Sequence, residues 1–166
     1  MRYQVVIAFA CGSMVAVSGA VASGQFSAVH DAKQLAACIQ AMDAPCVVRL
    51  SDRDAYREIN PPEFNFEAVQ TRMYKALRGK GISYTRFDIG APTTTSAEGG
   101  TRYQIVPFSF AMSGGDKPAQ ASRGYFVAIS RDKGRSWRFI DASTLTVEQL
   151  RKIMPTYSPK MSPPLA

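Results

Sequence analysis

The stretch Gly124–Asp141, with the sequence GYFVAISRDKGRSWRFID, decides the fold. Aromatic and β-branched residues alternate with a period of two on both sides of its centre, which is the pattern of half-buried β-strands. Asp132, Lys133 and Gly134 lie between the two runs, and Gly134 can take the positive φ that a short hairpin loop requires. The stretch therefore predicts two antiparallel strands joined by a tight turn.

Four residues of this hairpin form the pattern S-x-D-x-G-x-x-W, with Ser130, Asp132, Gly134 and Trp137 at the fixed positions. The pattern resembles the Asp-box at hairpin turns of sialidase-type propellers, in which the acid binds turn amides and the Trp packs beneath the turn. Propellers repeat the motif in successive blades, whereas it occurs once in this chain of 166 residues. We therefore expect a structural staple, and a sialidase function is excluded.

Residues 1–22 have the pattern of a secretory signal peptide. Arg2 supplies the positive start, an apolar run follows, and Ala20-Val21-Ala22 fits a cleavage site. A membrane anchor is the alternative, but the run is interrupted by glycine and serine and is short for a spanning helix of about 20 residues. Lipid attachment at Cys11 is a further alternative, although it would leave a very short apolar region. We expect cleavage, and a periplasmic or secreted bacterial protein.

Cleavage would leave 144 residues, which is enough for one domain with a hydrophobic core. We place this domain, whose α+β class is argued below, at residues 23–154, before a Pro-rich tail at residues 155–166. No later apolar run is long enough to span a bilayer. The mature net charge would be +6, from 19 basic and 13 acidic side chains. This surplus indicates either attraction to an anionic envelope surface or scattered solubilising charge, and the lack of a block of like charges favours the second.

Two cysteines remain after cleavage, Cys38 and Cys46, an even pair in an oxidising compartment. On one straight helix their Cα atoms would be about 12 Å apart, which is too far for a disulfide. Pro45 disfavours a continuous helix, and a bend at Asp43-Ala44-Pro45 would bring the two residues together. The sequence leaves two alternatives open: a disulfide between Cys38 and Cys46, or two buried thiols.

The spacing of apolar residues predicts four helices in the first half of the chain, at residues 29–42, 45–50, 51–58 and 62–78. Ser51 followed by Asp54 resembles a variant capping box for the third helix. The longest helix has one apolar face, made by Phe66, Val69, Met73, Ala76 and Leu77. Thr146 and Gln149 predict the cap of a last short helix that ends at residue 153.

Strands are predicted at residues 82–89 and 101–112, followed by the hairpin from about residue 122, with loops at 90–100 and 113–119. Pro107 lacks an amide hydrogen, so we expect an edge position or a bulge there. The order of elements predicts an α+β fold. In this fold the N-terminal helices pack on one face of a curved antiparallel sheet of three to four strands, and a short C-terminal helix follows.

This layout resembles the nuclear transport factor 2-like, or cystatin-like, α+β cone over residues 29–154. Residues 29–59 would supply the opening helices, 62–78 the long helix and 82–141 the curved sheet. The segments DKGRSWRFID and LTVEQLRKIMP are also similar to those of exported bacterial proteins of unassigned function. Members of the fold enclose an apolar pocket between sheet and helices, and some are isomerases or hydrolases. The resemblance implies a pocket but does not fix a function.

An isomerase of this fold would need a carboxylate base and an oxyanion donor that face the pocket. Strict alternation puts Tyr84 and Asp88 on one face of their strand, opposite Phe87, so only one of these faces can line an apolar pocket. We assign no catalytic residue. The candidate binding residues are Tyr84, Asp88, Tyr103, Phe108 and Tyr125.

Other chemistries find little support in the residue pattern. His30 is the one histidine and has no nucleophile motif beside it, which argues against nucleophilic catalysis and a histidine-rich zinc site. The spacing of Cys38 and Cys46 is not that of a zinc-binding pair, and no phosphate loop or dinucleotide fingerprint is present. We expect no metal and no cofactor. We also expect no nucleic-acid partner, because the chain has no basic stripe and carries an export signal.

The sequence favours an exported, non-enzymatic domain that binds an apolar small molecule or an envelope protein, and it leaves a homodimer open. The alternative is a small pocket enzyme, an isomerase or hydrolase, that uses a carboxylate and a tyrosine. A third hypothesis is electrostatic attachment to an anionic envelope polymer. A pocket lined only by Phe, Met, Val and Ile would favour binding, and a buried Asp88 beside a tyrosine hydroxyl would favour the enzyme.

Overall fold

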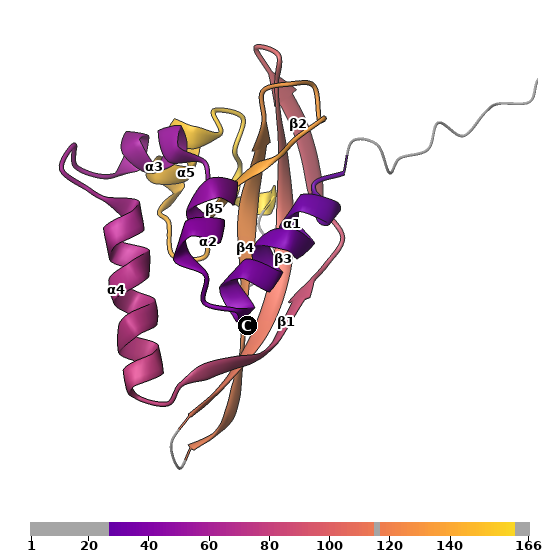
Figure 1. Cartoon of the computed structure of the whole chain (residues 1–166). Coiled ribbons are helices and arrows are strands. Elements are labelled where there is room, and N and C mark those ends of the chain that lie inside the picture. Colours follow the sequence, from indigo (N-terminus) through magenta and orange to yellow (C-terminus); the bar gives the residue numbers. More distant parts are fainter. Residues whose placement is uncertain (1–26, 115–116, 162–166) are drawn as a thin grey trace, which may run out of the picture.

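The computed structural model describes residues 27–114 and 117–161 (Figure 1). The predicted signal peptide, including Cys11, and the last residues of the predicted tail, 162–166, lie outside the described residues. The described elements are α1 Val29–Gln40, α2 Ala44–Leu50, α3 Arg53–Ile59, α4 Phe66–Gly79, β1 Ser83–Ile89, β2 Thr94–Glu98, β3 Thr101–Gly114, β4 Lys117–Ser130, β5 Arg138–Asp141, α5 Val147–Ile153 and the 3-10 turn η2 Pro159–Met161. The fold is α+β, and its order of helices, curved sheet and closing helix is the layout of the cone that the sequence resembles.

Every pairing between these strands is antiparallel, in the order β1-β3-β4-β5, and β2 pairs with β3 beyond the end of β1. β3 and β4 have 14 residues each and form the centre of the sheet. The sheet has one strand more than the three to four expected, because residues 94–98 of the predicted loop pair with the start of β3. The polar loop predicted at 113–119 is wrong, because β3 continues to residue 114 and β4 begins at 117.

Pro107 lies in the middle of β3, which is a central strand and has no bulge at this residue. Its carbonyl oxygen accepts a hydrogen bond from the Gly90 N–H at 2.8 Å. The amide nitrogen of Pro107 faces the same side as its carbonyl, where β1 has ended at Ile89 and β2 has not yet begun. The predicted edge position or bulge is therefore wrong. A central strand tolerates the proline because the neighbouring strand is interrupted beside it.

Short polar side chains start most of the helices by accepting a backbone N–H from the first turn. The capping box predicted for α5 is confirmed. The cap of α3 predicted at Ser51 is wrong, because its hydroxyl donates to a carbonyl of α2 instead. The long helix α4 begins at residue 66 rather than 62, because Asn65, the residue just before Phe66, caps it. The caps are Asp43 for α2, Asp52 for α3 and Asn65 for α4.

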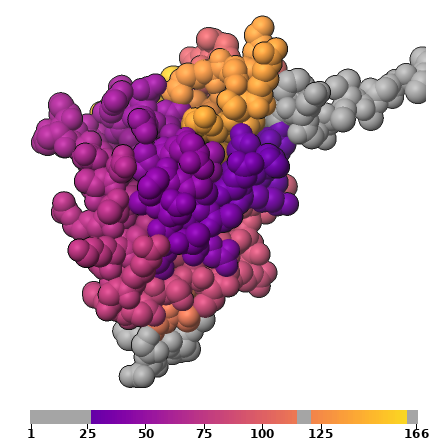
Figure 2. Space-filling model, in the orientation of Figure 1, coloured from indigo at the N-terminus to yellow at the C-terminus, as the bar shows by residue number. Residues whose placement is uncertain are grey.

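Helices cover both faces of the sheet, whereas the sequence predicted them on one. Figure 2 shows α1, α2 and α4 as a continuous surface over the first face. α5 and the segment around Tyr157 pack against the opposite face. Because successive strand residues point to opposite faces, β4 contributes Phe126 to the first core and Val127 to the second. None of the helices in residues 27–114 and 117–161 is long and apolar enough to cross a membrane.

Candidate ligand-binding cavity

A cavity of about 130 Å³ lies between the first face of the sheet and the helices that cover it. Six phenylalanines dominate its lining, five from the sheet and Phe66 from α4, and aliphatic side chains of α1, α2 and α4 complete the apolar part. Tyrosine, glutamine, serine and aspartate side chains contribute polar atoms. We call it the aromatic cavity, and its lining residues are Leu35, Ile39, Val47, Ser51, Tyr56, Phe66, Gln70, Met73, Tyr74, Tyr84, Phe87, Phe108, Phe110, Phe126, Phe139 and Asp141.

A β-bulge in β1 brings Tyr84 and Phe87 to the same side of the strand. The register between β1 and β3 shifts between Tyr84 and Arg86, so Thr85 interrupts the alternation. The rings of Tyr84 and Phe87 then lie 6.2 Å apart, and both line the aromatic cavity. The strict alternation expected from the sequence is therefore wrong for this strand. The bulge adds a hydroxyl to a wall that would otherwise be apolar.

The phenylalanine rings pack against one another across four strands. Phe108 of β3 lies 4.3 Å from Phe126 of β4 and 5.2 Å from Phe87 of β1, measured between ring centroids. Phe126 in turn contacts Phe139 of β5 edge to face, at 5.9 Å. Aromatic pairs at these distances are favourable beyond the area they bury. The rings therefore form a fixed apolar floor for the aromatic cavity.

Gly124 leaves room for the central ring of this floor. It lies opposite Phe108 in the register of β3 and β4. A Cβ atom on Gly124 would come within 2.4 Å of the Phe108 ring and 2.3 Å of the Ser143 hydroxyl oxygen. Contacts that short do not occur, so any side chain at this position would displace Phe108 or Ser143. Gly124, the first residue of the Gly124–Asp141 stretch, therefore allows both the strand pairing and the position of the Phe108 ring in the aromatic cavity.

Three tyrosines bring hydroxyl groups to the aromatic cavity: Tyr56 from α3, Tyr74 from α4 and Tyr84 from β1. Burial raises the pKa of each phenol above its ordinary value, and the charge of Asp141 further raises the pKa of Tyr84. All three therefore keep their protons at neutral pH. A protonated phenol can donate one hydrogen bond and accept others, so the cavity offers several donors.

Two further polar groups lie at the aromatic cavity. The Oε1 atom of Gln70 is buried and has no hydrogen-bond partner among the described residues. The carboxylate of Asp141 accepts hydrogen bonds from the backbone and hydroxyl of Ser143, at 3.0 and 2.7 Å. The backbone N–H of Asp141 donates to the Tyr56 hydroxyl oxygen at 3.4 Å. An unpaired buried acceptor is costly, so a ligand that donates a hydrogen bond to Gln70 would be favoured.

The structure separates the binding residues predicted from the sequence. Tyr84 and Phe108 line the aromatic cavity. Asp88 does not line it; its half-exposed carboxylate forms an ion pair with Arg86. Tyr103 and Tyr125 are buried in the second core, on the opposite face of the sheet. The predicted set is thus split between the two faces, and the buried Asp88 that would have favoured an enzyme is not found.

Sequence reasoning missed the polar residues that helices contribute. Gln70 and Tyr74 belong to the stripe of α4 that includes Phe66, Met73 and Leu77, with helical spacing. The predicted apolar face contained Val69 instead, which is 43% exposed. Tyrosine and glutamine at inward helical positions were the available indication, and hydrophobic spacing alone placed the face slightly wrong.

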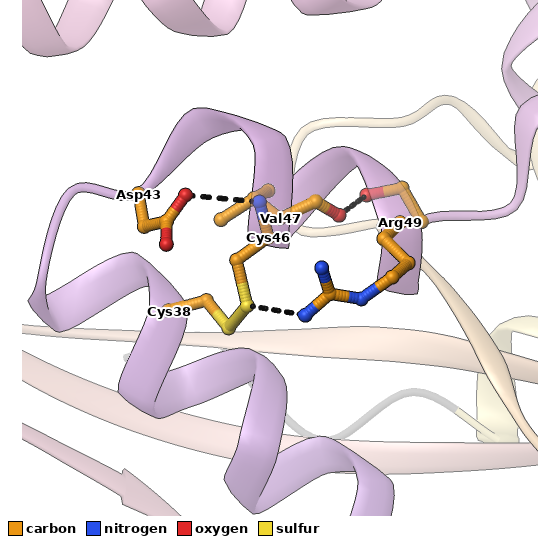
Figure 3. Close-up of a disulfide and its surroundings, with 6 residues drawn as sticks. Cys38, Asp43, Cys46, Val47 and Arg49 are labelled. Carbon is orange, nitrogen blue, oxygen red and sulfur yellow. Dashed lines mark hydrogen bonds between the residues drawn. A yellow bond between two sulfur atoms is a disulfide. The ribbon is translucent and has the colours of Figure 1, made fainter.

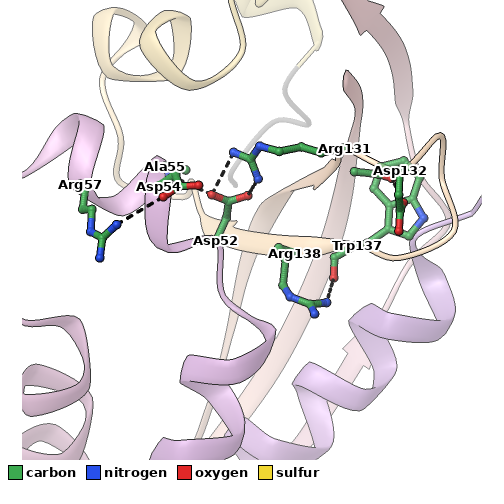
Figure 4. Close-up of polar contacts among 9 residues, drawn as sticks. Asp52, Asp54, Ala55, Arg57, Arg131, Asp132, Trp137 and Arg138 are labelled. Atoms are coloured by element: carbon green, nitrogen blue, oxygen red, sulfur yellow. Dashed lines mark hydrogen bonds and ion pairs between the residues drawn. The ribbon is translucent and has the colours of Figure 1, made fainter. Parts of the chain in front are cut away.

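The hairpin turn contains hydrogen bonds of the kind expected when the motif stabilises a turn. The Asp132 carboxylate accepts hydrogen bonds from the backbone N–H and the hydroxyl of Ser136, at 3.0 and 2.7 Å, and from the Ser130 hydroxyl at 2.7 Å. These bonds, led by the Ser136 hydroxyl, hold the pKa of Asp132 far below its usual range. Gly134 has φ of +94°, and Trp137 is buried near the turn (Figure 4). None of these residues lines the aromatic cavity.

A disulfide joins Cys38 and Cys46, with Cα atoms 5.7 Å apart (Figure 3). α1 ends at Gln40, and Asp43 caps the start of α2, so the chain reverses between the two cysteines. The bend predicted at Asp43-Ala44-Pro45 is confirmed, and of the two alternatives the structure has the disulfide. It fixes α1 against α2 beside the aromatic cavity, to which Ile39 and Val47 contribute. No three His, Cys, Asp or Glu side chains in the described part of the chain lie close enough together to hold a metal ion.

No protein-family model matches the sequence, and no curated protein matches it. Among solved structures, the chain is similar to a nuclear transport factor 2-like superfamily protein from Salmonella enterica serovar Typhimurium. The identity is 12%, the TM-score is 0.45, and the match covers 72% of this chain and 89% of that one. At this level of similarity the match carries no argument about ligand, partner or activity.

Proposed function

We propose that the protein is a non-enzymatic domain that binds a small apolar molecule in the aromatic cavity. The observation that carries the proposal is the floor of five phenylalanines from the sheet beneath a volume of about 130 Å³. An apolar cavity of about 150 Å³ in another protein is large enough for benzene. The ligand is therefore a molecule of about the size of a benzene ring, well below the size that pockets of about 300–1,000 Å³ accept.

The polar groups of the aromatic cavity define the ligand further. The hydroxyls of Tyr56, Tyr74 and Tyr84 can donate, and the unpaired Gln70 Oε1 can only accept. A ligand hydroxyl can meet both requirements at once, whereas a hydrocarbon leaves Gln70 unpaired. A carboxylate on the ligand would be repelled by Asp141. We therefore expect a phenol-like compound to bind more tightly than benzene, and benzene more tightly than benzoate.

A pair of tryptophan variants on α4 tests this proposal. Met73 lines the aromatic cavity, and Val69, one helical turn earlier, does not. Met73→Trp should fill the cavity and abolish the rise in melting temperature that phenol causes, whereas Val69→Trp should keep it. Differential scanning calorimetry with phenol, benzene and benzoate measures all three proteins. If the unmodified protein gains no stability from any of the three probes, or if both variants respond alike, the proposal is wrong.

A small pocket enzyme is the second candidate, and the placement of Asp141 favours it. This carboxylate lines the aromatic cavity together with Tyr56 and Tyr84, which are protonated donors. A carboxylate base and a phenol donor are what proton transfer next to a carbonyl group requires. Deuterium exchange at the α-carbon of cyclohexanone, followed by NMR, checks this candidate. Exchange that the protein accelerates and that Asp141→Asn abolishes would favour the enzyme over the binding domain.

We also propose that the protein is exported to the bacterial periplasm or beyond. The pattern of residues 1–22 supports this, and the Cys38–Cys46 disulfide is compatible with an oxidising compartment. Mass spectrometry of the protein purified from its native cells should find an N-terminus at Ser23 and a mass that rises on reduction by two hydrogens. An intact N-terminus in a cytoplasmic fraction would contradict export.

A further inference from the structure

A groove of about 300 Å³ lies where the junction of α2 and α3 meets the β4–β5 hairpin (Figure 4). It is separate from the aromatic cavity, although Ser51 lies in the wall of both. Four of its seven lining side chains are arginines, from three different parts of the chain. We call it the arginine groove, and its lining residues are Arg49, Ser51, Asp52, Arg53, Asp54, Arg131 and Arg138.

Arg131 is held in place by a buried carboxylate. Asp52 is 2% exposed, and both of its oxygens accept hydrogen bonds from the guanidinium of Arg131, one of them at 3.2 Å. The Oδ1 atom of Asp52 also accepts the Ala55 N–H at 2.9 Å. A carboxylate used in this way fixes the position of the arginine, and its charge is already paired with that arginine.

The other three arginines have no such partner. No carboxylate of the described residues forms an ion pair with Arg49, Arg53 or Arg138. Arg49 donates to the Cys46 sulfur and Arg138 to the carbonyl oxygen of Trp137, both of which are uncharged. The second acid of the groove, Asp54, lies 3.5 Å from Arg57, which is outside the lining. Four arginines thus line one groove with two carboxylates that already have cationic partners.

Like charges that converge on one groove repel each other, and an anion between them removes that cost. The planar fork of a guanidinium matches two oxygens of a phosphate group, and several forks can bind one phosphate at once. We propose that the arginine groove binds a phosphate group, supplied by free inorganic phosphate or by the headgroup of an anionic phospholipid. Part of the positive net charge of the chain would then belong to a defined binding site.

The proposal is tested with two triple variants that lose the same charge. The groove variant carries Arg49→Ala, Arg53→Ala and Arg138→Ala. Arg131 is kept, because its removal would leave the buried Asp52 unpaired and destabilise the fold. The control variant carries Arg72→Ala, Arg123→Ala and Arg151→Ala, three exposed residues that do not line the groove. Equal melting temperatures by circular dichroism show that both variants are folded.

Calorimetry with inorganic phosphate at low ionic strength is the first measurement. The unmodified protein should bind, the control variant should bind within twofold of it, and the groove variant should bind at least tenfold more weakly. Vesicles of phosphatidylglycerol and of phosphatidylcholine then distinguish the sources. Binding to the anionic vesicles alone, lost only in the groove variant, assigns the phosphate to a lipid. Equal loss in both variants, or no binding of either probe by the unmodified protein, overturns the proposal.

Discussion

The two faces of the same sheet differ in how completely they are filled. On the second face, aliphatic side chains are almost fully buried, with Ile105 and Val127 from the sheet against Leu150 and Met154 from α5 and beyond. On the first face, aromatic rings lie around a cavity, and α4 has Tyr74 as its one buried residue among those described. A helix with few buried side chains contributes less to stability, so we expect α4 on the first face to contribute less than α5 on the second.

Truncating one side chain on each face tests most directly whether the two faces contribute differently to the unfolding free energy. Leu150→Ala removes a side chain that is 1% exposed and should cost about 3 kcal/mol of unfolding free energy. Met73→Ala removes one that is 39% exposed at the rim of the aromatic cavity, and should cost less than about 1 kcal/mol. Urea unfolding followed by circular dichroism measures both. Equal losses would mean that the two faces contribute alike.

The disulfide joins two helices of the first face, so its removal measures how much this link contributes to stability. Replacing Cys38 and Cys46 by serine together opens a short loop and should cost about 2 kcal/mol, mostly by freeing the unfolded chain. The loss should be smaller than that of Leu150→Ala. Urea unfolding of the double variant measures it, with the unmodified protein under reducing conditions as a control. A reduced protein that keeps its full stability would contradict this assignment.

The parts of the fold that were predicted from the sequence rest on local chemistry. The hairpin around Asp132, the capping box of α5 and the reversal between Cys38 and Cys46 all depend on residues close together in the chain. The parts that were missed depend on distant partners. Thr94–Glu98 becomes a strand only because β3 lies beside it, and the central position of Pro107 depends on where β1 ends.

The same distinction explains the candidate site. Phe108 and Tyr84 were among the candidates as aromatic strand residues, but that set mixed the two faces of the sheet, and the bulge at Thr85 changed which face Phe87 shares. Tyr56 and Gln70 were missed because they lie on helices, whose rotation about their own axes depends on tertiary packing. Periodicity identifies an amphipathic helix, but it does not state which polar residues of that helix will face a cavity.

Gly124 tests whether the aromatic floor can be disturbed from within the sheet. Gly124→Ala places a methyl group against the Phe108 ring and should cost about 1–2 kcal/mol of unfolding free energy. It should also weaken phenol binding, because the displaced ring narrows the aromatic cavity. The matched control is Gly79→Ala at the end of α4, where an added Cβ atom meets nothing within 4 Å. A Gly124→Ala variant with unchanged stability and binding would show that the floor is not tightly fitted.

The tyrosines of the first face give the smallest expected effect, which is seen only in alkaline solution. Burial raises the pKa of Tyr74 in the folded protein, whereas an unfolded tyrosine loses its proton near pH 10. Below pH 10 the phenol is protonated in both states and the unfolding free energy does not depend on it. Above pH 10 only the unfolded state ionises, so stability falls by up to about 1.4 kcal/mol per pH unit for each such tyrosine. Tyr74→Phe should therefore make the loss of stability between pH 10 and pH 11 less steep, whatever it does at pH 7. Urea unfolding at three pH values measures the slope, and an equal slope in the variant would mean that water reaches the phenol in the folded state.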